Sequence, residues 1–264
     1  MAAFTAKDIQ SLRQRTGVGM LDAKRALEES SGDMDEAVNW LRIQGLAGAA
    51  KRADREASQG AVAIGRDGNA VAIVQLRCET DFVAKSDAFV ALTQELAQLV
   101  AAKGEGAEAD RADEVDRLKT TLKENISIGR VVRVEARDGG AVDGYLHLQA
   151  GRGVNAVIVA VSGGSEALAH DIAAHIAFAR PAYISRDEVP QEDVDAERRT
   201  VEEIARNEGK PDAALPKIVE GRLNGWYRER VLLDQPFIKD EKKTIAQLLA
   251  GAVVDRFAQV VIGD

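Results

Sequence analysis

The stretch AVAIGRDGNAVAIVQLRCETDFVAKSDAFVALTQELAQLVA, residues 61–101, changes its pattern of apolar residues part-way along. Its first half contains two runs rich in β-formers with the turn pair Asp67–Gly68 between them, which predicts a β-hairpin. Its second half carries apolar residues at helical spacing: Phe89, Leu92, Leu96, Leu99 and Val100. A hairpin followed by a helix predicts an α+β fold with antiparallel strands.

Thr80, Asp81 and Phe82 lie at the junction of the hairpin and the helix. One interpretation is structural: Thr80 or Asp81 caps the helix, and Phe82 packs beneath it as a hydrophobic staple. The other is functional: a tight turn displays the ring, with a carboxylate beside it, to another molecule, because aromatic anchors often dominate the energy of an interface. These residues alone leave both interpretations open.

A second stretch repeats the same order of patterns. Residues 130–149 predict another hairpin around an Arg-Asp-Gly turn, residues 155–164 a buried strand, and residues 165–180 a helix. We interpret the two stretches as a weak internal duplication. The second copy has Ser162, Gly163 and Gly164 where the first has Thr-Asp-Phe. An aromatic ring is therefore not required by the scaffold at this point, which favours a functional role for Phe82.

The rest of the chain is mainly helical. Residues 1–45 predict three short helices, and the stretch 16–19, Thr-Gly-Val-Gly, predicts an exposed loop that presents Val18 and Met20. Residues 112–125 predict a polar amphipathic helix. Two helices with narrow apolar stripes and a short connection predict an antiparallel hairpin that projects from the body. The expected domains are a bundle (1–45), a helical linker (46–59), a core N-subdomain (60–139), and a core C-subdomain (140–264) that includes the helical hairpin (187–229) and a C-terminal segment (230–264).

The composition is that of a soluble globular protein. The chain has 264 residues, and 43 acidic against 35 basic residues give a net charge of −8. Nucleic-acid binding relies on Lys and Arg against phosphate, so this balance favours a protein or small-ligand partner and argues against direct binding of nucleic acid. Cys78 is the only cysteine, which excludes internal disulfides. We expect no signal peptide and no membrane span, and hence a cytoplasmic protein.

Motifs for enzymes, metals and cofactors are missing or weak. No G-x-x-x-x-G-K-[ST] phosphate loop occurs, and the Gly209–Lys210 pair is followed by Pro211, which has no N–H to offer a phosphate. His170 and His175 are five residues apart, whereas helical metal ligands prefer three or four. No G-x-S-x-G elbow is present to position a nucleophilic serine. We therefore expect no catalytic residues, no metal and no cofactor.

Three segments resemble bacterial elongation factor Ts: LRQRTGVGMLDAKRALEESSGDMDEAVNWLR (12–42), CETDFVAK (78–85) and GKPDAALPKIVEGRLNGWY (209–227). The resemblance covers essentially the whole chain. It implies a three-helix, ubiquitin-associated-like bundle at the N-terminus, a core of two related α+β subdomains with antiparallel sheets, and a protruding antiparallel coiled-coil hairpin. It also implies a guanine-nucleotide exchange factor that acts on elongation factor Tu, in its GDP-bound and nucleotide-free states.

The resemblance further implies which residues meet that partner. Residues 80–85 match the family segment that intrudes near the partner's Mg²⁺ and phosphate site, with Asp81 and Phe82 central. The full set is Thr80, Asp81, Phe82, Val83, Ala84 and Lys85. The resemblance also implies that the N-terminal module contacts the same partner. The residues expected at this contact surface are Leu12, Val18, Gly19 and Met20. His147 matches a further interface position. The chain departs from the family in having Ala23 where a cysteine is frequent, and its segment after Thr244 is short.

Two rival functions remain open at this point. The bundle and the helical hairpin are both common interaction devices, so the chain can be read as a scaffold. The other rival is a small-ligand enzyme that uses a pocket between the two subdomains. Release of GDP from elongation factor Tu distinguishes the exchange factor from both.

Overall fold

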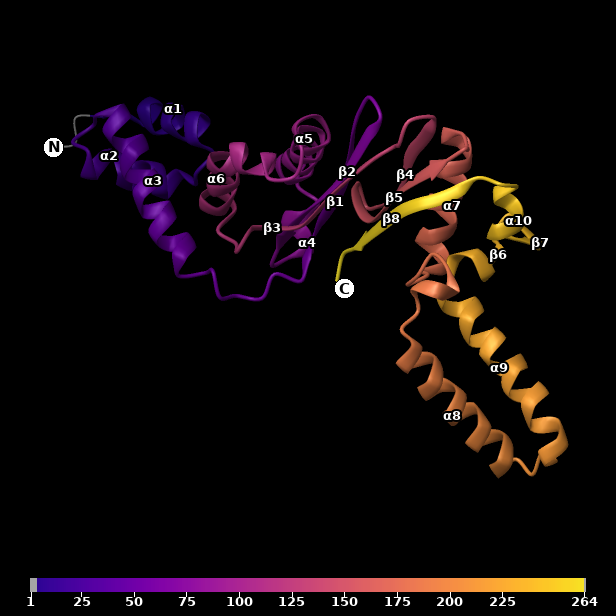
Figure 1. Ribbon diagram of the computed structural model, residues 1–264. Helices are drawn as coiled ribbons and strands as arrows, with labels where there is room; N and C mark the ends of the chain where they lie inside the picture. Colours follow the sequence, from indigo (N-terminus) through magenta and orange to yellow (C-terminus); the bar gives the residue numbers. More distant parts are fainter. Residues whose placement is uncertain (1–3, 264) are drawn as a thin grey trace. The chain divides into compact units, whose positions relative to one another are not determined.

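The computed structural model describes residues 4–263, and they form two compact units (Figure 1). The first unit contains the residues up to Arg133, together with Leu146–Ala156 and the chain end from Val260. The second contains Val134–Tyr145 and Val157–Gln259. Helices and antiparallel strands occur in the same chain, as expected for an α+β fold.

The N-terminal bundle consists of α1 (Ala6–Thr16), α2 (Met20–Glu29) and α3 (Met34–Ala50). Local capping defines its helices: Thr5 and Asp8 form a reciprocal capping box on α1, and the Asp33 side chain accepts the N–H of Glu36 at the start of α3. Gly17 ends α1 in the left-handed conformation, with φ of 75°. The buried residues of the bundle are Leu12, Val18, Ala23, Ala26, Leu27, Ala37 and Leu41.

The first sheet has the strand order β1-β2-β3. Its hairpin is formed by β1 (Gln59–Asp67) and β2 (Ala70–Cys78), which pair antiparallel from Gln59 opposite Cys78 to Asp67 opposite Ala70. Helix α5 (Asp87–Lys103) packs on this hairpin and buries Phe89, Leu92, Leu96 and Val100 against it. The remaining elements of this part are α4 (Asp81–Ala84), the 3₁₀ turn η1 (Ala107–Arg111), α6 (Ala112–Leu122) and β3 (Ser127–Glu135).

The second sheet has the order β4-β5-β8, and α7 (Glu166–Ala179) contributes Ile172 and Ile176 to the core beside it. Its strands are β4 (Gly140–Gln149), β5 (Arg152–Ser162) and β8 (Val253–Val261). Thr244 caps the short helix α10 (Ile245–Leu249) with a capping box. Smaller elements complete this part: η2 (Arg186–Glu188), η4 (Leu232–Asp234), β6 (Pro236–Phe237), β7 (Asp240–Thr244) and α10 (Ile245–Leu249).

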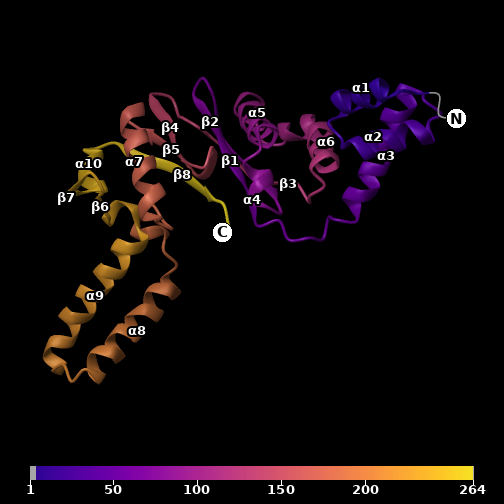
Figure 2. The ribbon, with the colours of Figure 1, turned by 180° about the vertical axis from the view of Figure 1, so that it is seen from behind.

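Two long helices, α8 (Gln191–Asn207) and α9 (Leu215–Arg230), form a hairpin within the second unit, with the 3₁₀ turn η3 (Asp212–Ala214) between them. Val201 of α8 packs with Val219 and Leu223 of α9. The two helices run side by side in opposite directions in both views (Figures 1 and 2). A narrow apolar seam between otherwise charged helices is what their sequence predicts.

The pairing predicted within residues 130–149 is wrong. Strand β3 belongs to the sheet of β1 and β2, whereas β4 belongs to the sheet of β5 and β8. Alternating apolar residues identify a strand but not its neighbour, which long-range packing selects. The two sheets nevertheless share one element order: a hairpin, a helix, and a later strand that joins beside the second hairpin strand.

Two predicted helical stretches are also corrected. The linker 46–59 is helical only as far as Ala50, after which residues 51–58 form turns and irregular chain. The helix predicted over 112–125 ends at Leu122, because Lys123 adopts the left-handed conformation with φ of 58° and closes the helix. No glycine marks this end, so sequence rules for helix termination miss it.

Membrane-spanning helices are not found among residues 4–263, since none of the helices there is both long and apolar enough to cross a bilayer.

Gly65 is a point of close packing in the first sheet. A Cβ added here would overlap the backbone carbonyl of Ala97 in α5. We expect Gly65→Ala to lower the free energy of unfolding by about 1–3 kcal/mol, the usual cost of overpacking. Gly221→Ala in α9, where a Cβ meets nothing within 4 Å, is the control and should be neutral or stabilising. Urea unfolding measures both, and equal stability of the two variants would contradict this account.

Candidate functional site: the turn after strand β2

The turn 79–86 connects β2 to α5 through the single helical turn α4. Cys78 ends β2 in the core, with its side chain fully buried, and its thiol donates to the carbonyl oxygen of Thr80 at 3.2 Å. Thr80 is the N-cap of α4, and its hydroxyl accepts the N–H of Val83 at 3.3 Å. The prediction that Thr80 or Asp81 caps the helix carrying Phe89 is therefore wrong: Thr80 caps the separate turn α4, and α5 begins after Ser86.

Glu124 holds this turn from the other side. One carboxylate oxygen, Oε2, accepts the N–H groups of Glu79 and Thr80, each at 3.0 Å. The other, Oε1, accepts the Thr80 hydroxyl at 2.5 Å. A hydrogen bond to an ionised carboxylate is shorter and stronger than a hydrogen bond between two neutral groups. Three such bonds on one side chain fix the start of α4.

A reciprocal set of bonds runs back from the turn. The Glu79 carboxylate accepts the N–H of Asn125 at 2.7 Å, and Arg55 lies 3.5 Å from its other oxygen. The Asn125 side-chain amide donates to the carbonyl oxygens of Ala53 and Arg55 at 3.0 and 2.7 Å. The turn is thus joined to residues 53–55 and to the chain after α6.

Phe82 is exposed over 84% of its surface, although the backbone around it is held on both sides. Its neighbours do the packing: Ala84 is fully buried, and Val83 packs against the core of the first sheet. The prediction that Phe82 forms a staple beneath the helix is therefore wrong. A ring exposed to this extent adds almost no burial to the fold, so it is available for contact with another molecule.

Asp81 and Lys85 form an i,i+4 ion pair beside the ring, with the ammonium 2.5 Å from the carboxylate. The hydrogen bond from Lys85 is the main reason that the pKa of Asp81 lies below its usual range, and the charges of Lys85 and Arg152 add to the effect. Asp81 is ionised at neutral pH like other aspartates, and the lowered pKa keeps it ionised further into the acid range. The site presents a negative charge next to an apolar ring.

Burial raises the pKa of the Cys78 thiol to about 12, and the nearby Glu124 charge acts in the same direction. The thiolate is the reactive form of cysteine, so this group is unsuited to nucleophilic chemistry. Among the described residues, no group of three or more His, Cys, Asp or Glu side chains is placed to hold a metal ion.

The N-terminal contact residues separate into buried and exposed ones. Leu12 and Val18 are 0% and 5% exposed, because both pack in the core of the bundle. The prediction that these two side chains form a contact surface is therefore wrong. Gly19 is the N-cap of α2, and Met20 beside it is 51% exposed. Leu21, which the sequence reasoning missed, is 82% exposed and extends the same edge.

His147 lies on β4 and is exposed, next to Leu148, which is 62% exposed.

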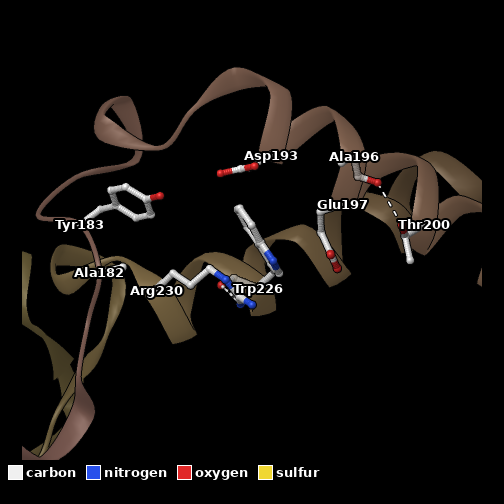
Figure 3. A pocket seen from close by; sticks show the side chains of 8 residues that line it. All are labelled: Ala182, Tyr183, Asp193, Ala196, Glu197, Thr200, Trp226 and Arg230. Atoms are coloured by element: carbon white, nitrogen blue, oxygen red, sulfur yellow. Dashed lines mark hydrogen bonds between the residues drawn. The ribbon is translucent and has the colours of Figure 1, made fainter. Parts of the chain in front are cut away.

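A pocket of about 340 Å³ lies at the base of the α8–α9 hairpin (Figure 3). Figure 3 shows Trp226 between Glu197 and Arg230, with Asp193 beyond one end of its ring. The Arg230 guanidinium lies over the Trp226 ring, 4.7 Å from the ring centre. The contact between the Arg230 cation and the Trp226 ring stabilises the base of the hairpin. No ligand is needed to account for the way these side chains pack.

Comparisons with known proteins agree over nearly the whole chain. The profile of a family described as Elongation factor TS matches residues 79–264. An elongation factor Ts of Kineococcus radiotolerans is 47% identical, over 96% of this chain and 96% of its own length. Those of Micrococcus luteus and Renibacterium salmoninarum are 43% and 45% identical over the full length of both chains.

The chain belongs to the elongation factor Ts family.

Glu124 is the main residue of the site that sequence reasoning missed. It is 44 positions from Thr80, and its stretch had been assigned to a polar helix, where a glutamate is unremarkable. A signal existed in the polar stretch Lys123–Asn125 between the helix and the next strand, because side chains in such a connection are free to bond to neighbouring backbone. The pattern alone does not say which backbone that is.

The ion pair between Asp81 and Lys85 leads to a prediction about the pKa of Asp81 in this member of the elongation factor Ts family. Because the folded-state pKa of Asp81 is lowered, the ion pair adds stability above the ordinary carboxyl pKa of about 3.9 and loses it as the pH falls through the lowered value. We expect Lys85→Met to raise the pKa of Asp81 towards its ordinary value, as followed by carboxyl-carbon NMR. Lys103→Met, which removes the partner of Asp110, should leave Asp81 unchanged. An unaltered Asp81 titration in Lys85→Met would contradict the assignment.

Proposed function

We propose that this chain is the guanine-nucleotide exchange factor for elongation factor Tu, and that the turn with Asp81 and Phe82 carries out the exchange. Membership of the family implies nucleotide exchange on elongation factor Tu in translation, without covalent chemistry. The observation that carries the finer proposal is the exposure of Phe82, at 84%, on a turn whose backbone is fixed by Glu124.

In the proposed mechanism the Phe82 ring enters an apolar crevice of the partner's nucleotide domain. Its burial there supplies binding energy, of about 1.5–3 kcal/mol for a side chain of this size. The Asp81 carboxylate arrives beside it, close to the Mg²⁺ and phosphate contacts of GDP. Displacement of those contacts weakens nucleotide binding, so GDP leaves. Thr80, Val83, Ala84 and Lys85 act by shaping the turn: a cap, two packed residues and the ion-pair partner.

Exchange of this kind needs negative coupling between two ligands of one partner. If the factor weakens nucleotide binding, the nucleotide must weaken binding of the factor by the same ratio. The factor therefore binds both the GDP-bound and the nucleotide-free partner, and incoming nucleotide releases it. No bond is made or broken, so the turn needs rigidity and shape instead of an acid, a base or a nucleophile.

The other parts are assigned supporting contacts. We assign the bundle, as a ubiquitin-associated-like module, a second contact on the same partner through Gly19, Met20 and the added Leu21. The exposed apolar edge of Met20 and Leu21 supports this assignment. His147 is proposed as a further contact because its side chain is exposed. The α8–α9 hairpin is proposed to be the family's coiled coil, which its narrow apolar seam supports.

The expected four-part division, with boundaries at 45, 59 and 139, is retained as a proposal for the family's domain organisation. We propose further that the chain works in the cytoplasm and contacts neither nucleic acid nor membrane directly, for which its net charge of −8 is the support.

Phe82→Ala is the direct test, with release of labelled GDP from purified elongation factor Tu as the readout. The wild type should accelerate release, and Phe82→Ala should lose at least about tenfold of that acceleration, the equivalent of 1.4 kcal/mol. Stability should change by less than about 0.5 kcal/mol, because the ring is exposed. Phe178→Ala, which removes a ring that is 79% exposed on α7, is the matched surface control and should retain exchange.

Phe89→Ala is the matched core control. Its ring is fully buried, so its loss should cost about 3–5 kcal/mol of stability. A folded Phe82→Ala protein that exchanges normally would refute the role of the ring. A wild-type protein that does not accelerate GDP release at all would refute exchange itself and favour a scaffold.

A further inference from the structure

We propose that helix α6 and the connector Lys123–Asn125 after it form a positioning element that holds the Met20–Leu21 edge of the bundle and the Phe82 turn at a fixed spacing. The inference rests on the proposed function, since it concerns how two surfaces of the first unit act on one partner. It adds a role for residues that the exchange mechanism itself does not use.

The bundle packs on α6 by close contact. Gly45 of α3 faces Thr120, and a Cβ at position 45 would overlap Thr120 Cγ2 and Oγ1. A Cβ at Gly17, in the loop after α1, would lie 3.3 Å from Cγ2 of Thr121. Glycine at position 45 has no helical advantage, since alanine is favoured there by about 1 kcal/mol. Its presence is explained by the approach of α6.

Polar contacts follow the same helix along its length. Arg42 pairs with Asp113 near the start of α6, at 3.1 Å. Arg52, after the end of α3, donates to the carbonyl oxygen of Lys119 at 3.1 Å. Single exposed ion pairs contribute little, but together with the glycine contact they define one orientation of the bundle on α6. Figure 1 shows α6 next to α3.

The connector begins where α6 ends and continues this series towards the site. The left-handed backbone of Lys123 turns the chain, and its ammonium lies 2.7 Å from Asp22. Asp22 is in the first turn of α2, directly after Met20 and Leu21. The first residue of the connector therefore contacts the helix that carries the exposed edge of the bundle, next to Met20 and Leu21.

The next two residues of the connector hold the other surface. Glu124 accepts three hydrogen bonds from Glu79 and Thr80, and Asn125 binds Glu79 and the carbonyl oxygens of residues 53 and 55. Two consecutive residues, Lys123 and Glu124, thus contact α2 and the start of α4 respectively. The residues that contact the two surfaces are thus neighbours in the chain, and the α3–α6 contacts add to this connection.

Such an arrangement lowers the cost of binding at two points. When one surface has docked, the second is already near its target, and little conformational freedom remains to be lost. A bundle that moves freely would dock independently, and the effective concentration of Phe82 at its crevice would fall. Loss of the α6 contact is therefore expected to weaken binding of the partner more than the rate within the complex.

Gly45→Ala is the variant that separates the two surfaces, because its methyl group pushes α3 away from Thr120 while favouring the helix itself. Gly221→Ala in α9 is the control for the helical gain of a glycine-to-alanine change, because its Cβ meets nothing within 4 Å and lies outside the first unit. Thr120→Gly removes the three atoms nearest to the new methyl group, which are Cγ2, Oγ1 and Cβ of Thr120. The double variant Gly45→Ala/Thr120→Gly should therefore restore the wild-type arrangement.

The first readout is structural and independent of exchange. Spin labels at Glu29→Cys in α2 and Glu95→Cys in α5, both exposed positions, report the distance from the bundle to the first sheet in a Cys78→Ala background. We expect a narrow distance distribution for the parent and for Gly221→Ala. Gly45→Ala should broaden it, and the double variant should narrow it again.

The second readout is GDP release at increasing concentrations of factor. Gly45→Ala should raise the half-saturating concentration about tenfold and leave the maximal rate unchanged, whereas the double variant should recover. Glu124→Ala should instead lower the maximal rate, because the Phe82 turn loses its support, and Glu124→Asp should recover part of it. Glu114→Ala, elsewhere on α6, is the control for loss of a carboxylate.

Outcomes separate this inference from the proposed function. If the parent accelerates GDP release but Gly45→Ala keeps both the narrow distances and the half-saturating concentration of the parent, the positioning role is refuted while exchange stands. Broadened distances with unchanged exchange also refute it. Failure of the parent to accelerate release overturns the proposed function and this inference together.

Discussion

The carboxylate of Glu124 is the interaction on which the candidate site depends. Without its three hydrogen bonds, the N–H groups of Glu79 and Thr80 would need water, and the one-turn helix α4 would have only the Thr80 hydroxyl to begin it. A helix of four residues is not stable on its own. The rigid display of Phe82 is therefore a property of the tertiary structure, contributed from the far end of α6.

The features that sequence could predict are those decided within a few residues. Caps at Thr5, Asp33 and Thr244 bond to backbone three positions on, and the β1–β2 hairpin closes on itself by a short turn. The two residues of that turn are Gly68 and Asn69, one position later than the predicted Asp67–Gly68 pair, because Asp67 pairs with Ala70. The helical stripe also identified Phe89 as a core residue. In each case the residues and their partners are neighbours in the chain, so pattern and structure carry the same information.

The missed features depend on partners that are far apart in sequence. The sheet that β3 joins, the burial of Leu12 and Val18, and the grip of Glu124 on Thr80 each depend on how separate elements pack. Phe82 and Phe89 make the point most directly. They are the same residue type, seven positions apart, yet Phe82 is 84% exposed and Phe89 is fully buried. On α4 the side that faces the core is formed by Val83 and Ala84, which leaves Phe82 on the outer side.

The buried thiol at the end of β2 has a consequence for how the protein withstands oxidants. With its pKa raised to about 12, Cys78 is almost entirely protonated in the cell, and the protein core covers it. Peroxide and alkylating reagents attack thiolates, so the only cysteine of the chain is chemically silent while the fold is intact. Its modification requires the end of β2 to open. The rate at which a thiol reagent reacts with the native protein therefore reports how often the end of β2, next to the Phe82 turn, opens.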